Sequence, residues 1–260
     1  MPSIIPIPAF RDNYIWLIRE DSRAAVVDPG DAAPVIEYLD REGLELAAII
    51  ATHHHQDHVG GNVGLLLRWD VPVFGPARES IPGRTHALSE GDRAVVPGID
   101  VTFDVLDIPG HTAGHIAYHG RVGANETLFC GDTLFAAGCG RLFEGTPAMM
   151  YASLNEKLGK LPDETRVYCG HEYTIANLRF ALAVEPDSGA LRERLAREQA
   201  KRDRSLPTLP STIGEEHATN PFLRASLLEV KRAAERHAGQ SLSDDVASFA
   251  ELRAWKNSFQ

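Results

Sequence analysis

One segment of the chain gathers enough metal-binding side chains to do chemistry. Residues 52–58 read THHHQDH and directly follow an apolar run, Ala47–Ala51, that predicts a buried strand. The end of a buried strand lies at an edge of its sheet, where functional sites tend to form. Burying this many ionisable groups without a metal ion would be costly, so the segment predicts a metal site. Four of its side chains are expected as ligands: His53, His55, Asp57 and His58.

The spacing divides these four ligands between two metals. Side chains alternate in extended backbone, so His53 and His55 point the same way and can share one metal. Asp57 and His58 follow as the chain turns towards a helix, and they can serve a second metal beside the first. Imidazole and carboxylate ligands suit Zn²⁺ and also iron or manganese. His54 points the opposite way and is expected to pack or to support a ligand.

Three later segments offer what this cluster lacks, and each follows a predicted strand. PGHTAGH offers His111, CGD offers Asp132, and YCGH offers His171. The carboxylate of Asp132 is able to bridge two metals. Strand ends that converge on one sheet edge would bring all seven ligands together. His115, in the first of these segments, is expected to be structural.

The pattern of apolar residues predicts an α/β protein. Runs rich in β-branched and aromatic residues, bounded by turn residues, predict strands. Helical character is expected over 31–41 and 65–69. Strands mixed with helices in this way indicate an α/β sandwich. The clearest strands are predicted over 14–18, 24–27, 47–51, 71–74, 128–130 and 166–169.

After about residue 173 the sequence changes from a mixture of predicted strands and helices to predicted helices. Residues 205–220 are rich in Pro, Thr and Ser and are expected to form a loop. The last helix is expected to have Ser243 as its N-cap. A small helical domain at the C-terminus follows from this pattern. Its helices are predicted over 175–183, 191–204, 223–237 and 244–256.

The composition argues against several classes of partner. Lys and Arg number 26 against 36 Asp and Glu, which gives a formal net charge of −10. Nucleic acid and anionic membranes need a basic surface, so we expect neither as a partner. No stretch approaches the eighteen or so apolar residues of a membrane span, and no signal peptide is visible. An anionic substrate would need a local basic patch inside this repulsive field.

The cysteines indicate a reducing compartment. There are three and no CxxC, which suits the cytoplasm better than a disulfide framework. None has a metal-ligand spacing, so all are expected to be small buried hydrophobic residues. They are Cys130, Cys139 and Cys169.

The seven predicted ligands resemble the metal motif of the metallo-β-lactamase superfamily. Within it, the chain is similar to the glyoxalase II (hydroxyacylglutathione hydrolase) family over nearly its whole length. The similarity lies in THHHQDH, PGHTAGH, GDTLFAAGCGR, GHEYT, NPFLR and the C-terminal pair Arg253 and Lys256. It implies an αββα metallo-β-lactamase sandwich as the catalytic domain over residues 1–173. A small all-helical substrate-binding domain would follow over 174–260.

The resemblance also implies a role for each site residue. His53, His55 and His111 would hold one metal, and Asp57, His58 and His171 the other. Asp132 would bridge the two, and Asp57 and Asp132 are the carboxylates expected in catalysis. Phe143 stands where some family members carry a tyrosine, which removes one hydroxyl contact to glutathione. The expected glutathione-binding residues are Arg141, Phe143, Tyr173, Arg253 and Lys256.

The implied activity is hydrolysis of S-(2-hydroxyacyl)glutathione thioesters. S-D-lactoylglutathione would give D-lactate and glutathione, the second step of methylglyoxal detoxification. Two divalent metal ions per chain, Zn or else Fe or Mn, would hold a bridging hydroxide that attacks the thioester carbonyl. A thiolate leaves without a strong acid, because the pKa of a free thiol is roughly 8.5. We expect a cytoplasmic monomer that acts on a small-molecule glutathione thioester.

Three alternatives remain open. The first is a mono-iron oxidoreductase of the same fold, similar to the persulfide dioxygenases. The second is another hydrolase of the fold, such as a lactonase or a β-lactamase. The third is a binding module without catalysis. The complete second-metal set and the C-terminal basic pair favour the glutathione thioester hydrolase, and the absence of a GxSxG segment argues against a serine nucleophile.

Overall fold

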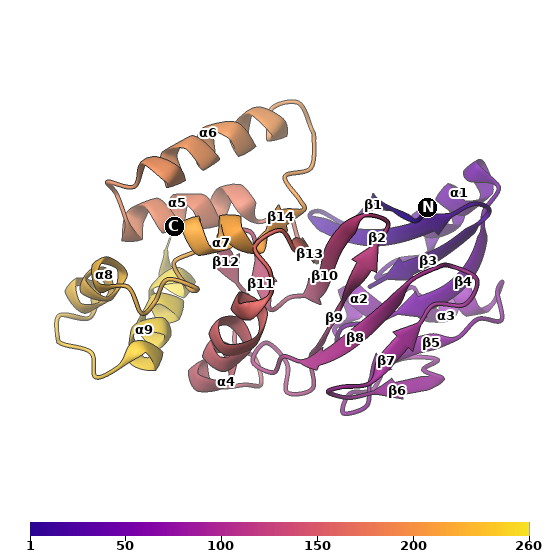
Figure 1. Cartoon of the computed structure of the whole chain (residues 1–260), viewed down its shortest axis with the longest axis horizontal. Coiled ribbons are helices and arrows are strands. Elements are labelled where there is room, and N and C mark those ends of the chain that lie inside the picture. Colours follow the sequence, from indigo (N-terminus) through magenta and orange to yellow (C-terminus); the bar gives the residue numbers. More distant parts are fainter. Residues whose placement is uncertain (260) are drawn as a thin grey trace. The chain divides into compact units, whose positions relative to one another are not determined.

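The computed structural model describes residues 1–259, and the chain divides into two compact units (Figure 1). Unit 1 is formed by Met1–Ile108, Ala113–Gly131 and Tyr168–His171. Unit 2 is formed by Pro109–Thr112, Asp132–Val167 and the chain from Glu172 onward. Each unit thus contains segments from distant parts of the sequence.

The first sheet of unit 1 has six strands in the order β1-β2-β3-β4-β5-β6. β1, β2 and β3 pair antiparallel, whereas β3, β4, β5 and β6 pair parallel. Neighbouring parallel strands end at the same edge, so the residues after β3 and after β4 come together there. The strands are β1 (Ser3–Ala9), β2 (Asn13–Glu20), β3 (Arg23–Val27), β4 (Glu45–Ile50), β5 (Val73–Pro76) and β6 (His86–Leu88).

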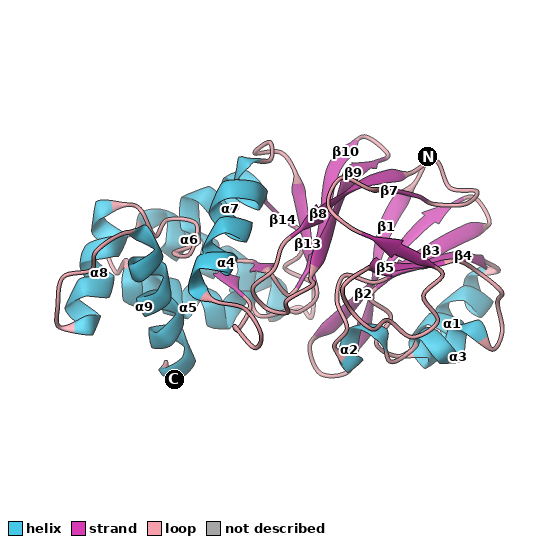
Figure 2. Ribbon diagram, turned by 90° about the horizontal axis from the view of Figure 1, so that it is seen from below, coloured by secondary structure: helices cyan, strands magenta, loops and turns pink. Residues whose placement is uncertain are grey.

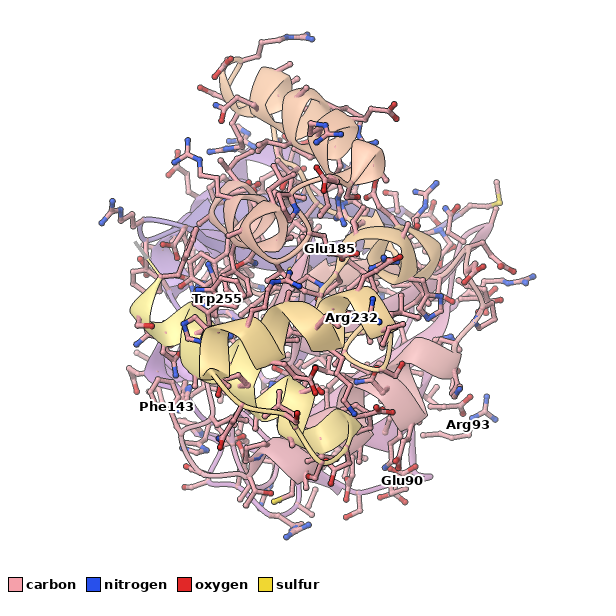
Figure 3. The ribbon with its side chains drawn as sticks, turned by 90° about the vertical axis from the view of Figure 1, so that its left-hand side faces the viewer. Glu90, Arg93, Phe143, Glu185, Arg232 and Trp255 are labelled. Carbon is pink, nitrogen blue, oxygen red and sulfur yellow. The ribbon has the colours of Figure 1, made fainter. Side chains whose placement is uncertain are left out.

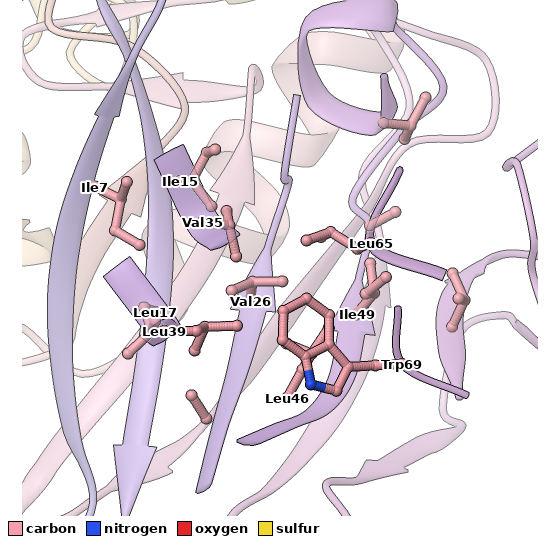
Figure 4. Close-up of a cluster of buried hydrophobic side chains, with 14 of the residues drawn as sticks. Ile7, Ile15, Leu17, Val26, Val35, Leu39, Leu46, Ile49, Leu65 and Trp69 are labelled. Carbon is pink, nitrogen blue, oxygen red and sulfur yellow. The ribbon is translucent and has the colours of Figure 1, made fainter. Parts of the chain in front are cut away.

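Two helices cover one face of this sheet, α1 (Ala32–Glu42) and α3 (Asn62–Leu66) (Figure 2). The side chain of Asp31 accepts a hydrogen bond from the backbone N–H of Ala33 and so caps α1. α1 buries Val35 and Leu39 in a cluster of strand side chains (Figure 4). A short helix, α2 (Gln56–Val59), ends the segment that carries the first predicted ligands.

Four strands of the second sheet lie wholly in unit 1, in the order β10-β9-β8-β7, and these neighbours pair antiparallel. This sheet faces the first sheet: the Tyr118 hydroxyl donates to the carbonyl of Ala51 over 2.9 Å. An edge-to-face contact of 5.6 Å joins the rings of Phe103 and Phe129 in the buried layer between them. The strands are β7 (Arg93–Val95), β8 (Thr102–Asp107), β9 (Ile116–Val122) and β10 (Asn125–Gly131).

Unit 2 is mostly helical. α4 (Pro147–Tyr151) begins at its N-cap Thr146 and continues into a π-helix, η1 (Ala152–Lys157), and a 3₁₀ turn, η2 (Leu158–Lys160). The longer helices are α5 (Thr174–Val184), α6 (Gly189–Arg202), α7 (Ile213–Thr219), α8 (Leu228–Ala238) and α9 (Asp245–Ser258). Its short strands are β11 (Leu134–Phe135), β12 (Gly138–Cys139) and β14 (Ser211–Thr212), which pairs with the first residues of β13 (Arg166–Cys169).

Aromatic packing and one buried ion pair hold these helices together. Phe180 of α5 stacks on Phe222 at 5.9 Å, and Phe222 contacts Phe249 of α9 at 5.6 Å. All three rings are fully buried. Arg194 of α6 donates to Glu216 of α7 over 2.7 Å, and both side chains are buried. A buried charge needs such a partner, so the pair fixes α6 against α7.

The predicted α/β fold class with a helical C-terminal part is confirmed. Each of the six clearest predicted strands overlaps an observed strand. The boundary expected between residues 173 and 174 remains a prediction. No helix within residues 1–259 is long and apolar enough to cross a membrane.

Three local predictions were wrong. Residues 205–220 are not only a loop, because they contain β14 and α7, which the Thr212 side chain caps at the N–H of Glu215. The N-cap of α9 is Asp244 and not Ser243, because the Asp244 carboxylate accepts a hydrogen bond from the N–H of Ala247. The helix expected from residue 223 begins at Leu228. A helix of two turns leaves little periodicity in a Pro- and Thr-rich sequence, so α7 could not be recognised.

Candidate metal centre and binding residues

The segment after β4, a loop followed by α2, carries four predicted ligands, all in unit 1. The side chains of His53 and His58 are buried, and that of His55 is half-buried. The ring centroid of His53 lies 4.8 Å from that of His55 and 4.2 Å from that of His58. Gly30 allows the loop to pass close by, because a Cβ there would lie 1.9 Å from the carbonyl oxygen of Asp57. The loop therefore presents its imidazoles as one group.

Of the two predicted ligand triads, one lies wholly within unit 1. The Asp57 Oδ2 atom is 3.4 Å from His171 Nε2 and 3.6 Å from His58 Nε2. Ligand atoms of all three residues lie within 4.8 Å of one another. Two ligand atoms bound to one tetrahedral Zn²⁺, each at about 2.1 Å, lie about 3.4 Å apart. The spacing of the triad therefore fits a single divalent metal.

Unit 2 supplies the other two predicted ligands. His111 and Asp132 are both buried, and His111 Nε2 lies 3.5 Å from Asp132 Oδ2. Asp132 directly follows β10, and the glycine at position 140 lets the chain fold back over it: a Cβ on Gly140 would lie 1.9 Å from the Asp132 carbonyl oxygen. An imidazole and a carboxylate at this distance form a pair of potential metal ligands.

The Nδ1 atom is already used in four of the predicted histidine ligands. In His171 it meets Asp12 Oδ1 at 2.8 Å, and in His58 it meets Asp28 Oδ2 at 3.1 Å. In His111 it donates to the carbonyl of Arg141 over 2.8 Å. His53 Nδ1 lies 3.0 Å from the Thr52 hydroxyl, whose own hydrogen goes to Asp28. Metal-bound histidines characteristically donate the second ring N–H in this way, which leaves Nε2 for the metal.

Asp28 was missed by the sequence reasoning. It is 4% exposed and accepts three hydrogen bonds, from the Thr52 N–H, the Thr52 hydroxyl and His58 Nδ1. These bonds tie the end of β3 to the loop after β4. The sequence did contain a signal for Asp28, because this residue follows an apolar strand just as Asp132 does. Asp12 and Asn13 were missed as well, and nothing in their local sequence marks them as ligand supports.

His54, His115 and the cysteines lie as expected. His54 Nδ1 pairs with Glu79 Oε2 at 3.0 Å and is not part of the triad. His115 is fully buried, stacks on the His53 ring at 4.5 Å, and donates from Nδ1 to the carbonyl of Ile116. The three cysteines are free thiols and buried. His115 thus supports the ring of a predicted ligand.

The residues expected to bind glutathione all lie in unit 2. Phe143 is 63% exposed (Figure 3), and its ring lies edge-on to His111 at 5.3 Å. Tyr173 precedes α5 and packs its half-buried ring against Phe135 at 5.3 Å. Arg141 is exposed.

Arg253 is far more buried than a surface binding residue. Only 5% of it is exposed, and it donates from Nη1 to the carbonyl of Cys139 over 2.8 Å. Its Nη2 donates to Asn257 over 3.1 Å. The guanidinium therefore joins α9 to β12, two residues before Arg141. Arg253 therefore anchors the hairpin formed by β11 and β12.

The surroundings of Lys256 oppose the positive charge of its ammonium group. Burial, followed by the charge of Arg253, lowers the pKa of Lys256 to about 8, and the charge of Arg141 adds to this effect. Its ammonium donates to the carbonyl of Ala176 over 3.2 Å. The three cations are therefore close enough to repel one another. Such a cluster is suited to an anion.

The sequence matches two family models, one directly after the other along the chain. Residues 9–171 match the metallo-beta-lactamase superfamily, and residues 172–259 match the hydroxyacylglutathione hydrolase C-terminus. The structure of ETHE1 from Myxococcus xanthus is similar as well, with a TM-score of 0.66 and 25% identity. That similarity covers 98% of this chain and 90% of the other. The fold and the histidine–aspartate clusters thus define a metallo-β-lactamase-type protein with sites for divalent metals.

Close relatives narrow the class. A hydroxyacylglutathione hydrolase from Alkalilimnicola ehrlichii is 59% identical over 259 residues, which cover 99% of both chains. One from Nitrosomonas europaea is 51% identical over 260 residues, which cover 100% of this chain and 97% of the relative. The chain belongs to the hydroxyacylglutathione hydrolase family.

Proposed function

We propose that this chain hydrolyses S-(2-hydroxyacyl)glutathione thioesters, with S-D-lactoylglutathione as the typical substrate. The products are D-lactate and glutathione, and the reaction is the second step of methylglyoxal detoxification. The observation that carries the proposal is the match of residues 172–259 to the C-terminal part of hydroxyacylglutathione hydrolases. Relatives with that name at 51% and 59% identity support it over the full length.

The proposed cofactors are two divalent metal ions, Zn²⁺ or else iron or manganese. His53, His55 and His111 would hold one, Asp57, His58 and His171 would hold the other, and Asp132 would be the shared carboxylate. The engaged Nδ1 atoms and the spacing of the unit 1 triad support this assignment. When bound, such metals act as Lewis acids towards the thioester carbonyl and lower the pKa of the attacking water.

The chain's own contribution to binding is a local cationic cluster. Glutathione carries two carboxylates, whereas the protein has a formal net charge of −10. Arg141 and Lys256 concentrate positive charge on unit 2, and Arg253 holds the hairpin that precedes Arg141. These cations would attract the glutathione carboxylates, which belong to a part of the substrate that does not react. This attraction should therefore stabilise ground and transition states alike and appear mainly in KM.

The departing group needs no dedicated acid. A thiol with a pKa of roughly 8.5 leaves readily as the thiolate at neutral pH. None of the proposed site residues has to donate a proton to it. The residues thus need only orient the substrate and hold the metals.

A mono-iron oxidoreductase of the same fold is the competing activity. The second triad, Asp57, His58 and His171, argues against it, because a mono-iron enzyme does not require a second set of ligands. The similarity to relatives named hydroxyacylglutathione hydrolase points in the same direction.

Steady-state hydrolysis of S-D-lactoylglutathione by metal-analysed protein tests the proposal. The rate at which thioester absorbance is lost should be proportional to the enzyme concentration. Metal analysis of the same protein should give about two metals per chain. Oxygen uptake with a glutathione persulfide serves as the comparison. Oxygen consumption without thioester hydrolysis would contradict the proposed function and would show that the protein is the oxidoreductase.

A further inference from the structure

The turn between β1 and β2 reaches the unit 1 triad. Ala9 pairs with Asn13, so Phe10, Arg11 and Asp12 form a three-residue turn. Phe10 has φ of 51°, a left-handed value that lets the chain reverse tightly. Asn13 then forms an antiparallel bridge with His171. The turn is thereby fixed beside the strand end that carries a triad ligand.

A second backbone bond fixes the start of β2 at the same place. The N–H of Tyr14 donates to the carbonyl of Gly170 over 2.9 Å. The Trp16 indole donates to the carbonyl of Cys169 over the same distance. Both partners immediately precede His171. The position of the turn relative to this ligand is therefore set by backbone bonds and does not depend on the Asp12 or Asn13 side chains.

Asp12 orients the His171 ring. Its Oδ1 atom lies 2.8 Å from His171 Nδ1, and a carboxylate can only accept this bond. The proton of the neutral imidazole is therefore held on Nδ1. Nε2 therefore carries the lone pair, and it lies 3.4 Å from Asp57 Oδ2. A nearby carboxylate also raises the basicity of the ring.

Asn13 orients the Asp57 carboxylate. Its Nδ2 donates to Asp57 Oδ2 over 3.0 Å and lies 3.4 Å from the Asp57 carbonyl oxygen. Asn13 is 7% exposed, whereas the Asp57 side chain is 43% exposed. Burial therefore does little to restrict the rotamer of Asp57. A buried amide that contacts both its side chain and its backbone supplies that restriction.

We propose that Asp12 and Asn13 are positioning residues that set the affinity of the Asp57–His58–His171 triad for its metal. Two consecutive residues of one turn hold two of the three ligands, so the turn acts as a clasp on this triad. The clasp rests on the proposed function, because it assumes that the triad holds a metal. It contacts neither His53 nor His55 through these bonds, so it should act on one of the two metals only.

The test compares Asp12→Ala and Asn13→Ala with the wild type. Zn²⁺ is titrated into metal-free full-length protein against a chelating dye, and the two affinities are fitted separately. Loss of a hydrogen-bonded support of a metal ligand typically weakens affinity about 10- to 100-fold. We expect that loss at one site in each variant and no change at the other. Asp12→Asn keeps an acceptor oxygen and should lose less than Asp12→Ala.

Two control variants remove the same side chains elsewhere in unit 1. Asp100→Ala changes an exposed residue between β7 and β8, and Asn125→Ala changes the half-buried first residue of β10; both affinities should stay at the wild-type values. The unfolding temperature of each metal-free variant shows whether the fold is intact. General destabilisation would weaken both metals together, whereas a clasp weakens one.

The outcomes separate the two proposals. If the wild type and both variants bind two metals with unchanged affinities, the clasp is overturned and the proposed function stands. Equal weakening of both sites also overturns the clasp, since it assigns the turn a structural role. If the wild type binds fewer than two metals, the proposed two-metal function fails and the clasp fails with it.

Discussion

Lys256 carries its charge where burial and a neighbouring cation both oppose it. These effects lower its pKa to about 8, so the ammonium is present below this pH and is lost above it. If Lys256 binds a glutathione carboxylate, KM for S-D-lactoylglutathione should rise as the pH increases through about 8. Steady-state kinetics between pH 6.5 and 9.5, corrected for spontaneous hydrolysis (a range chosen about one and a half pH units either side of that pKa), would measure the rise.

The matched variant is Lys256→Arg, which keeps its charge over this range. Its KM should stay level where that of the wild type rises. Lys256→Met should show a high KM at every pH. A wild-type KM that is independent of pH, together with a normal KM in Lys256→Met, would remove this residue from the binding site.

Phe143 presents an exposed ring beside a predicted metal ligand. Phe143→Tyr adds a hydroxyl that can donate one hydrogen bond to glutathione, worth about 0.5–1.5 kcal/mol. We expect KM to fall a few-fold and kcat to stay nearly the same. The measurement is a pair of saturation curves at one metal loading. A tenfold loss of kcat would instead mean that the new hydroxyl disturbs His111.

At the scale of elements, the bond from α9 to β12 explains how a buried arginine can influence binding. Arg253→Met keeps much of the side-chain volume and removes the donor to the Cys139 carbonyl. An orphaned buried carbonyl costs about 1–3 kcal/mol, so the free energy of unfolding should fall by this amount. KM should rise too, because the hairpin that leads to Arg141 loses its anchor. Denaturant unfolding and steady-state kinetics measure the two effects.

Arg236→Met is the control, since Arg236 is an exposed arginine of α8. It should change neither stability nor KM. If Arg253→Met had wild-type stability and a KM raised tenfold or more, Arg253 would contact the substrate directly. The structure would then have to open around a side chain that is now 5% exposed.

At the scale of the whole molecule, metal binding should contribute to the stability of the fold. A metal that binds only the folded chain stabilises it by about 2.7 kcal/mol when its concentration is 100 times Kd. The ligands of this chain come from segments far apart in sequence, so the unfolded chain cannot hold them together. We expect chelation to abolish thioester hydrolysis and to lower Tm, as measured by calorimetry.

Reloading the chelated protein completes this experiment. Zn²⁺, Fe²⁺ or Mn²⁺ should restore both hydrolysis and Tm, whereas Mg²⁺ should not, because histidine ligands suit it poorly. Full turnover in verified metal-free protein would contradict the two-metal chemistry.

The sequence alone predicted the ligands, and it determined the class of fold. Each ligand segment follows an apolar strand, and strand and ligand are close neighbours in the chain, so His111, Asp132 and His171 could be recognised locally. Alternation of side chains in extended backbone also separated His54 from His53 and His55. These signals are short-range, and the strands that carry them formed as expected.

Only the tertiary structure decided which residues support the ligands. Asp12 meets His171 across 159 positions of sequence, and Arg253 meets Cys139 across 114. Such contacts depend on how strands and helices pair, and no local pattern records that pairing. For the same reason the sequence predicted Arg253 only as a glutathione-binding residue and could not show that it is buried. Residue type and spacing can predict metal ligands, whereas the hydrogen bonds that orient them exist only once distant segments have packed.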